Sequence, residues 1–232
     1  WFVFEIYNLY LGNWYYVGGP ESRIVRWTGT FVSFATVLPG LWVVQVLIDS
    51  LLPESLRNRS QVNFPSITPG LVLISGMIAS VVPLLWPDQL FPLVWGGLLL
   101  VADGLAHRNG WRSFLGQWEK GNLKPLITWL ISAAVCGFLW EFWNAQASAG
   151  WIYTVPSMGE WRLFEMPLLG YLGFPPFALM IRRLYTLYED GKWVTSSIGK
   201  TLLVLFSILL CLLTLRAMDD RTYVSYRLKP LE

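Results

Sequence analysis

Residues 126–145 read LITWLISAAVCGFLWEFWNA, twenty consecutive residues in which Glu141 is the one charged side chain. A helix that crosses the hydrocarbon core of a bilayer needs roughly 20 mostly apolar residues. This stretch therefore predicts a transmembrane helix, and it places a carboxyl and an amide, Glu141 and Asn144, near its end. The fold class follows because similar windows recur along the chain.

Six apolar windows predict spans. They cover residues 28–48, 69–86, 91–101, 126–145, 163–181 and 198–215. The third reaches a useful length only if residues 88–106 are taken whole, so a tilted or re-entrant piece is the alternative to a full crossing. Residues 1–11 have the composition of the end of a further helix. We expect an all-α polytopic membrane protein of about six or seven transmembrane helices, some kinked by proline.

The composition supports this class. Of the 232 residues, 54% are hydrophobic and 14% are charged, whereas soluble chains average about 25% charged residues. The mean hydropathy is +0.47. These values exclude a nucleic-acid-binding protein, a disordered hub and a soluble enzyme, and the net charge of +2 predicts no acidic partner.

Few residues are suited to bind a cofactor. The single histidine, His107, follows an apolar window next to Arg108, so a pair of intramembrane histidines for a b-type haem is absent from the sequence. Cys136 and Cys211 lie in apolar runs, where a thiol usually behaves as a small hydrophobic group. We expect no metal site and no haem; a bound carotenoid or lipid is the candidate ligand.

Basic residues in alternate loops predict the orientation. One side of the membrane receives ten of them: Arg57, Arg59, Arg108, Arg112, Lys120, Lys124, Arg182, Arg183, Lys192 and Lys200. The other side receives seven: Arg23, Arg26, Arg162, Arg216, Arg221, Arg227 and Lys229. The positive-inside rule makes the first side cytoplasmic. We expect an integral protein of the bacterial inner (cytoplasmic) membrane.

A self-match is the most informative feature of the sequence. Glu5 and Asn8 correspond to Glu141 and Asn144 with the same spacing, Trp14 corresponds to Trp151, and Tyr16 corresponds to Tyr153. The offset changes from 136 to 137 between the Glu and the Trp, which implies a one-residue insertion. Pro39 and Pro176 each follow the matched tryptophan by 25 residues. An internal duplication explains these matches, and biased aromatic composition is the alternative.

The duplication predicts three segments. Residues 1–110 form a first half that lacks its first helix, residues 111–124 form an amphipathic or solvated connector, and residues 125–232 form the second half with a C-terminal tail. The first half would be completed by a helix upstream of Trp1. The two halves are parallel if residues 91–101 cross the membrane and inverted if they do not; in the parallel case both motifs lie on the non-cytoplasmic face.

Ionisable side chains within apolar windows are the candidate site. Glu141 and Asn144 share one helix face, and Glu165 lies near the expected start of the next span, where an acidic residue is favoured in any helix. Apolar surroundings favour the neutral form of a carboxyl, so Glu141 and Glu165 are the candidate catalytic pair for acid chemistry. Candidate ligand-binding residues surround both motifs: Glu5, Asn8, Trp14, Trp140, Trp143, Asn144, Trp151 and Tyr153. A structural carboxyl held by Asn144 and an indole is the alternative for Glu141.

The segment from Asn144 through Trp151 and Tyr153 to Glu165 resembles the membrane-embedded lycopene cyclase family, of the heterodimeric or fused type. The similarity covers residues 140–182, with a weaker match at 4–48. That family is built from repeated helical units and cyclises the ends of a linear carotene by acid chemistry. The chain departs from the family pattern, because Trp143-Asn144 replaces an Asp-Asn pair and Glu165 stands alone where the family has two adjacent acids.

Two functions follow from these observations. The first is an integral membrane protein that binds an isoprenoid or carotenoid-type lipid, with lycopene-cyclase-like acid–base cyclisation or isomerisation as its chemistry. The second is a non-catalytic accessory subunit of a larger photosynthetic or respiratory membrane complex, which binds pigment or lipid. The expected partners are membrane lipid or carotenoid and, for the second function, other membrane subunits. Nucleic acid is excluded.

Overall fold

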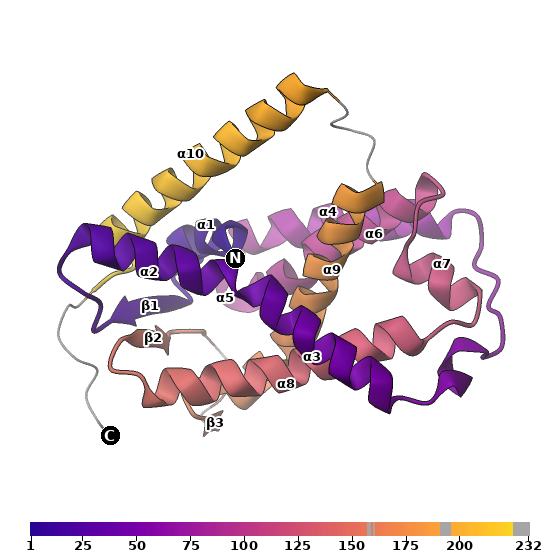
Figure 1. Cartoon of the computed structure of the whole chain (residues 1–232), viewed down its shortest axis with the longest axis horizontal. Coiled ribbons are helices and arrows are strands. Elements are labelled where there is room, and N and C mark those ends of the chain that lie inside the picture. The colour runs from indigo at the N-terminus through magenta and orange to yellow at the C-terminus, as the bar shows by residue number, and fades with distance from the viewer. Residues whose placement is uncertain (157–158, 160, 191–195, 225–232) are drawn as a thin grey trace. The chain divides into compact units, whose positions relative to one another are not determined.

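The computed structural model describes residues 1–156, 159, 161–190 and 196–224 (Figure 1). Helices make up most of this part of the chain, together with two short two-stranded sheets. The chain divides into two compact units, each built from segments that are distant in sequence. The first unit contains Trp1–Val37, Trp140–Leu168 and Lys192–Glu232, and the second contains Leu38–Leu139 and Leu169–Gly191.

The first unit contains three whole helices, the end of a fourth and the strands found in the described residues. Its elements are α1 (Phe2–Leu11), β1 (Trp14–Val17), α2 (Arg23–Ala35), the end of α8 (Lys124–Gln146), β2 (Gly150–Tyr153), β3 (Arg162–Leu163), β4 (Met166–Pro167) and α10 (Ser197–Arg221). β1 pairs antiparallel with β2, and β3 pairs antiparallel with β4. α1 packs against α10. Phe4 and Trp14 are among the buried aromatic residues of this unit.

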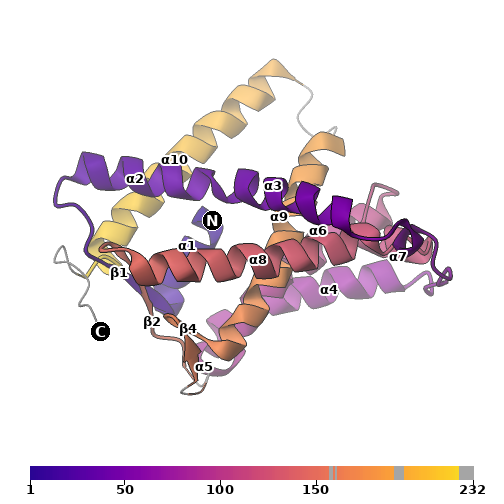
Figure 2. The ribbon, with the colours of Figure 1, turned by 60° about the horizontal axis from the view of Figure 1, so that its bottom comes forward.

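The second unit is helical. Its elements lie wholly or mainly within it: α3 (Val37–Leu51), η1 (Glu54–Arg57), α4 (Thr68–Val81), η2 (Val82–Leu84), α5 (Pro87–Leu90), η3 (Phe91–Leu93), α6 (Val94–Arg108), α7 (Phe114–Glu119), the start of α8, η4 (Leu168–Gly173) and α9 (Phe174–Asp190). α4 lies beside α6 (Figure 2), and α6 also packs against α9. A Cβ on Gly76 would lie 2.5 Å from the Val101 nitrogen. Glycine therefore allows the α4 and α6 backbones to approach closely.

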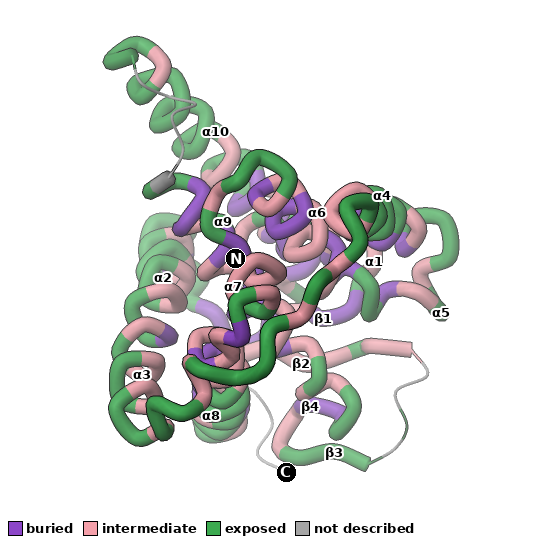
Figure 3. Tube along the Cα trace, turned by 90° about the vertical axis from the view of Figure 1, so that its right-hand side faces the viewer, coloured by how far each residue is buried: buried purple, intermediate pink, exposed green. Residues whose placement is uncertain are grey.

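Four helical stretches among the described residues are long and apolar enough to cross a membrane: Arg23–Leu51, Pro87–Arg108, Lys124–Gln146 and Ser197–Arg221. Phe2–Leu11 and Thr68–Leu84 are shorter apolar helices. The chain is thus mostly helical and has the features of an integral membrane protein. The window at 91–101 becomes part of a 22-residue helical stretch, long enough to span. Residues along α10 are largely exposed (Figure 3), and most of the exposed ones are apolar.

Prolines explain two helix boundaries. α2 ends at Ala35 and α3 begins at Val37, because Pro39 has no N–H to bond the Ala35 carbonyl and its ring crowds that carbonyl. In α9, Pro175 and Pro176 occupy the first turn, where an N–H has no intrahelical partner in any case. The prolines at 39 and 176 therefore break one helix and begin another.

The predicted helix over 163–181 is wrong in its first part. Residues 162–167 form the β3–β4 hairpin, residues 168–173 form a 3-10 helix, and the α-helix begins only at Phe174. Phe164 adopts φ 58° in the hairpin turn, a left-handed conformation that no α-helix can include. Glu165 therefore lies in a turn and does not begin a helix.

The expected amphipathic connector is shorter than its sequence suggested. Only Phe114–Glu119 is helical between 111 and 124. Ser113 caps its start by accepting the Gly116 N–H at 2.9 Å, and Gly121 follows its end with φ 71°. Nearby, Asp103 accepts the N–H groups of Phe114 and Leu115. These contacts give Asp103 a structural role in the second unit.

Candidate functional site

The first motif consists of Glu5, Asn8, Trp14 and Tyr16, and in it β1 folds back onto the end of α1. The helix ends at Gly12, which has φ 64° and donates its N–H to the Asn8 carbonyl. The Asn8 side chain then binds the backbone of Trp14 twice: its Nδ2 donates to the Trp14 carbonyl at 2.8 Å, and its Oδ1 accepts the Trp14 N–H at 3.0 Å. Asn8 therefore fixes the position of β1 against α1.

Glu5 lies one helical turn before Asn8 and is fully buried. Its Oε1 accepts three hydrogen bonds: from Tyr16 Oη at 2.6 Å, from Trp14 Nε1 at 3.2 Å and from Trp1 Nε1 at 2.5 Å. The carboxyl is thus enclosed by one phenol and two indoles. Burial, with the nearby Glu5 carboxylate, raises the pKa of the Tyr16 hydroxyl, so the phenol stays neutral.

The second motif consists of Glu141, Asn144, Trp151 and Tyr153. It has the same hydrogen-bond frame, in which the asparagine binds the backbone of the tryptophan twice and the tyrosine donates to the glutamate. Asn144 Nδ2 donates to the Trp151 carbonyl at 2.9 Å, and Asn144 Oδ1 accepts the Trp151 N–H at 2.9 Å. Tyr153 donates to Glu141 Oε1 at 2.8 Å, and Glu141 is fully buried. A Cβ on Gly150 would lie 2.3 Å from Asn144 Oδ1, so this position requires glycine for the frame to form.

The two motifs meet in one sheet of the first unit. β1 and β2 pair antiparallel, with Trp14 opposite Tyr153 and Tyr16 opposite Trp151. Each motif's tryptophan therefore faces the other motif's tyrosine, which is the pairing of a local two-fold arrangement. The loop before β1 has two residues and the loop before β2 has three.

The two motifs differ in closure. Trp14 and Tyr16 are buried, whereas Trp151 and Tyr153 are only partly buried. Trp151 Nε1 donates to the Tyr153 hydroxyl at 2.8 Å and not to Glu141. At an offset of 136, Gly137 occupies the sequence position that corresponds to Trp1. The second motif is therefore the more open of the two at its tryptophan and tyrosine.

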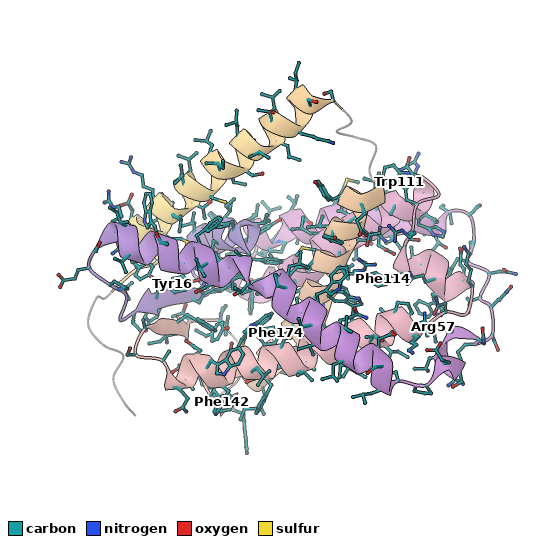
Figure 4. All side chains as sticks on the ribbon, viewed as in Figure 1. Tyr16, Arg57, Trp111, Phe114, Phe142 and Phe174 are labelled. Atoms are coloured by element: carbon teal, nitrogen blue, oxygen red, sulfur yellow. The ribbon has the colours of Figure 1, made fainter. Side chains whose placement is uncertain are left out.

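The remaining predicted site residues are more dispersed. Glu165 is partly buried in the β3–β4 turn, and its backbone carbonyl accepts a hydrogen bond from Arg162 at 3.3 Å. The residues next to Glu141 and Glu165 in sequence are in contact: the Phe142 and Phe164 rings lie 5.8 Å apart, edge to face. Figure 4 labels Phe142 on α8 and Tyr16 on β1. Trp140 is partly buried on α8, and Trp143 is exposed there.

Sequence reasoning missed a polar cluster around Asp219. This carboxylate accepts hydrogen bonds from Arg26 Nε at 2.7 Å and Trp27 Nε1 at 2.9 Å, and it forms an ion pair with Arg23 at 3.4 Å. The Arg26 guanidinium also lies over the Tyr223 ring. The contacts join α2 to the end of α10, 192 or more positions away in sequence, and no local pattern predicts such a pair.

Tyr223 extends this cluster to the first motif. Its ring stacks on Tyr16, with centroids 5.2 Å apart. The Tyr16 N–H donates to the Thr222 carbonyl, and the Val224 N–H donates to the Tyr16 carbonyl. Burial raises the pKa of the Tyr223 hydroxyl. The segment after α10 therefore covers the side of β1 that does not face β2.

A second group of ion pairs lies in the other unit. Lys124, almost fully buried at the start of α8, binds Glu54 at 2.5 Å and Asp49 at 3.6 Å. The hydrogen bond from Lys124, followed by that from Arg57, lowers the pKa of the Glu54 carboxyl. Asp103 pairs with the buried Arg183 at 3.9 Å. These groups pair with one another, as expected of structural contacts.

Within the described residues, no group of three or more histidine, cysteine, aspartate or glutamate side chains is placed to hold a metal ion. Comparisons with protein-family models, with curated proteins and with solved structures found no match for this chain. The assignment of a function therefore depends on the geometry of the two motifs.

Proposed function

We propose that this membrane protein binds an isoprenoid or carotenoid-type lipid at the second motif and performs acid–base cyclisation or isomerisation on it. The observation that carries the proposal is the fully buried Glu141 carboxyl, which accepts the Tyr153 hydroxyl at 2.8 Å near the end of an apolar helix. Ionisable groups are costly in such a position and mark a functional site by default. The second motif is the more open of the two, so it is the better candidate for a ligand.

Each residue has a proposed role at this site. Glu141 is the general acid that protonates an alkene carbon of the lipid, and its carboxylate then takes a proton from the resulting cation as the new double bond forms. Tyr153 holds the carboxyl in place, and its hydroxyl accepts the Trp151 indole N–H at 2.8 Å. That bond leaves the Trp151 ring face to stabilise a carbocation. Glu165 is the second carboxyl, which stabilises developing positive charge, while Trp140, Trp143 and Asn144 line or shape the site.

The resemblance of residues 140–182 to the membrane-embedded lycopene cyclases supports this chemistry. An internal duplication supports it as well, because that family is built from repeated helical units. The matched asparagines make the same pair of bonds, and the matched tyrosines donate to the matched glutamates. We infer two parallel halves in six or seven spans, with both motifs on the non-cytoplasmic face of a bacterial inner membrane.

A second function is favoured by the exposed surface of α10. Only 11% of its most apolar window is buried inside the structure, and residues such as Ile198 and Phe206 are 75% and 62% exposed. Lipid covers such a helix in a free membrane protein, and neighbouring helices cover it in an assembly. The alternative proposal is therefore a non-catalytic subunit of a photosynthetic or respiratory complex that binds pigment or lipid.

Organic extraction of the purified protein, followed by mass spectrometry, tests the proposal. The expected result is an isoprenoid at about one molecule per chain in the wild type. Conversion of an added linear polyene to a cyclic or isomerised product should be lost in Glu141→Gln and retained in Trp161→Leu, a control at a tryptophan that is 81% exposed. A stoichiometric protein subunit without isoprenoid would favour the accessory role.

A further inference from the structure

The two oxygens of the Glu5 carboxyl have opposite surroundings. Oε1 accepts hydrogen bonds from Trp1, Trp14 and Tyr16 at 2.5, 3.2 and 2.6 Å. A carboxylate oxygen has about two lone-pair directions, so three donors occupy its full acceptor capacity. An additional proton on this carboxyl therefore has no place on Oε1.

Oε2 of Glu5 is buried and has no hydrogen-bond partner among the described residues. The whole side chain is 0% exposed. A buried carboxylate that lacks a donor on one oxygen is unfavourable in apolar surroundings, and such groups usually become neutral. A proton on Oε2 removes the charge and leaves every hydrogen bond on Oε1 unchanged.

The groups around Glu5 supply little compensating charge. Tyr16 on β1 and Tyr223 after α10 are uncharged near neutral pH, and Cys211 on α10 is a free thiol. Arg26, the nearby arginine, is paired with Asp219 at 2.7 Å. In the described part of the chain, no lysine or arginine forms an ion pair with Glu5.

We propose that the first motif is a buried proton-binding site in which Glu5 holds its proton on Oε2. Trp1, Trp14 and Tyr16 fix the carboxyl through Oε1, so Oε2 is the position at which the proton is gained or lost. This inference goes beyond the proposed lipid chemistry of the second motif and does not depend on a bound lipid. It assigns a proton as the ligand of the first motif.

Infrared spectroscopy of the full chain in lipid bilayers at pH 7 tests the proposal. The wild type should show the carbonyl stretching band of a protonated carboxylic acid. Glu141, the proposed general acid, contributes to the same region, so the two carboxyls are separated by variants. Glu5→Gln should remove one component of the band, whereas Glu141→Gln, the matched change in the second motif, should leave that component in place. Tyr16→Phe should shift the component to higher frequency, because the carbonyl oxygen Oε1 loses one hydrogen-bond donor.

The Tyr16→Phe shift keeps the test decisive if Glu5→Gln does not fold. An unchanged band in both variants, or a wild-type spectrum with carboxylate bands alone, would overturn the proposal. The outcome is separate from that of lipid extraction, because a chain without bound isoprenoid can still show the Glu5 band. A chain with bound isoprenoid can equally lack it.

Discussion

The first and second motifs share a hydrogen-bond frame and differ in what encloses it. In both, an asparagine binds the backbone of a tryptophan twice, and a tyrosine donates to a buried glutamate. In the first, two indoles also reach the carboxyl. In the second, the indole of Trp151 donates its hydrogen bond to the tyrosine hydroxyl. The frame depends on the Glu-x-x-Asn spacing, and the closure depends on the residues around it.

This difference suggests a division of roles between the motifs. A carboxyl enclosed on all sides can exchange a proton but has no space for a larger ligand. In the proposed function, Glu141, behind a partly buried tryptophan and tyrosine, is the carboxyl that a lipid approaches. The experiments below compare matched residues, so each result bears on the difference between the motifs as well as on one residue.

The largest effect is expected from the asparagines. Asn8→Ala should lower the free energy of unfolding by about 3 kcal/mol, because it leaves a buried N–H and a buried carbonyl of Trp14 without partners, at roughly 1–3 kcal/mol each. Asn144→Ala should cost about 2 kcal/mol, because its bonds are less buried. Denaturant unfolding in detergent measures both. Asn109→Ala, at an exposed asparagine, is the control; equal costs at all three positions would refute the shared frame.

Removal of one hydroxyl from each motif should separate stability from function. Tyr16→Phe should destabilise the chain by about 1–2 kcal/mol and leave lipid binding intact, because the lost bond is buried. Tyr153→Phe should cost about 1 kcal/mol and reduce lipid binding, because Glu141 and the Trp151 indole both lose a partner. Unfolding curves and lipid content measured on the same preparations test the pair. A loss of lipid in Tyr16→Phe alone would reverse the assigned roles.

The tight loop of the first motif should respond to a single methyl group. Gly12→Ala should lower the free energy of unfolding by about 1 kcal/mol, because an alanine is strained at φ 64°. The added Cβ has no neighbour within 4 Å, so no steric clash adds to this cost. Ala147→Gly, in the longer loop of the second motif, should change stability by less. Thermal unfolding compares the two variants. A neutral Gly12→Ala would show that the left-handed conformation is not required there.

A smaller effect is expected at alkaline pH. The raised pKa values of Tyr16 and Tyr223 mean that the folded state keeps both phenols neutral. Their contribution to stability is complete below the unfolded tyrosine pKa of about 10, and it declines as the pH rises through the higher folded values. Absorbance of the phenolate form should show tyrosines that ionise only above the usual pH range of a phenol. Loss of part of this fraction in Tyr16→Phe assigns it to Tyr16.

Much of the first-order architecture could be predicted from the sequence. The window at 126–145 lies within Lys124–Gln146, and that at 198–215 lies within Ser197–Arg221, because long apolar runs have few alternatives to a helix. The Glu-x-x-Asn spacing also pointed to both motifs, but in place of the expected bond from Asn144 to Glu141, Asn144 binds the Trp151 backbone and Tyr153 donates to Glu141. The required information was local in each case, since the partners of Glu5 and Glu141 lie within about a dozen residues.

The errors occurred where distant or backbone-specific effects decide the structure. The helix predicted to begin at residue 163 does not form there, because Phe164 has a positive φ and the chain forms a hairpin before Phe174. Apolar composition does not reveal this backbone preference. The cluster around Asp219 was not predicted. Its partners Arg23 and Arg26 are almost two hundred positions away, and a single sequence has no signal that links them.

The lipid content of two matched variants tests the central claim most directly. Trp14→Leu and Trp151→Leu change equivalent tryptophans, so their isoprenoid-to-protein ratios can be compared after purification and extraction. We predict that Trp14→Leu retains the wild-type ratio and that Trp151→Leu loses most of it. Loss in Trp14→Leu with retention in Trp151→Leu, or equal ratios in both, would contradict the assignment of the ligand to the second motif.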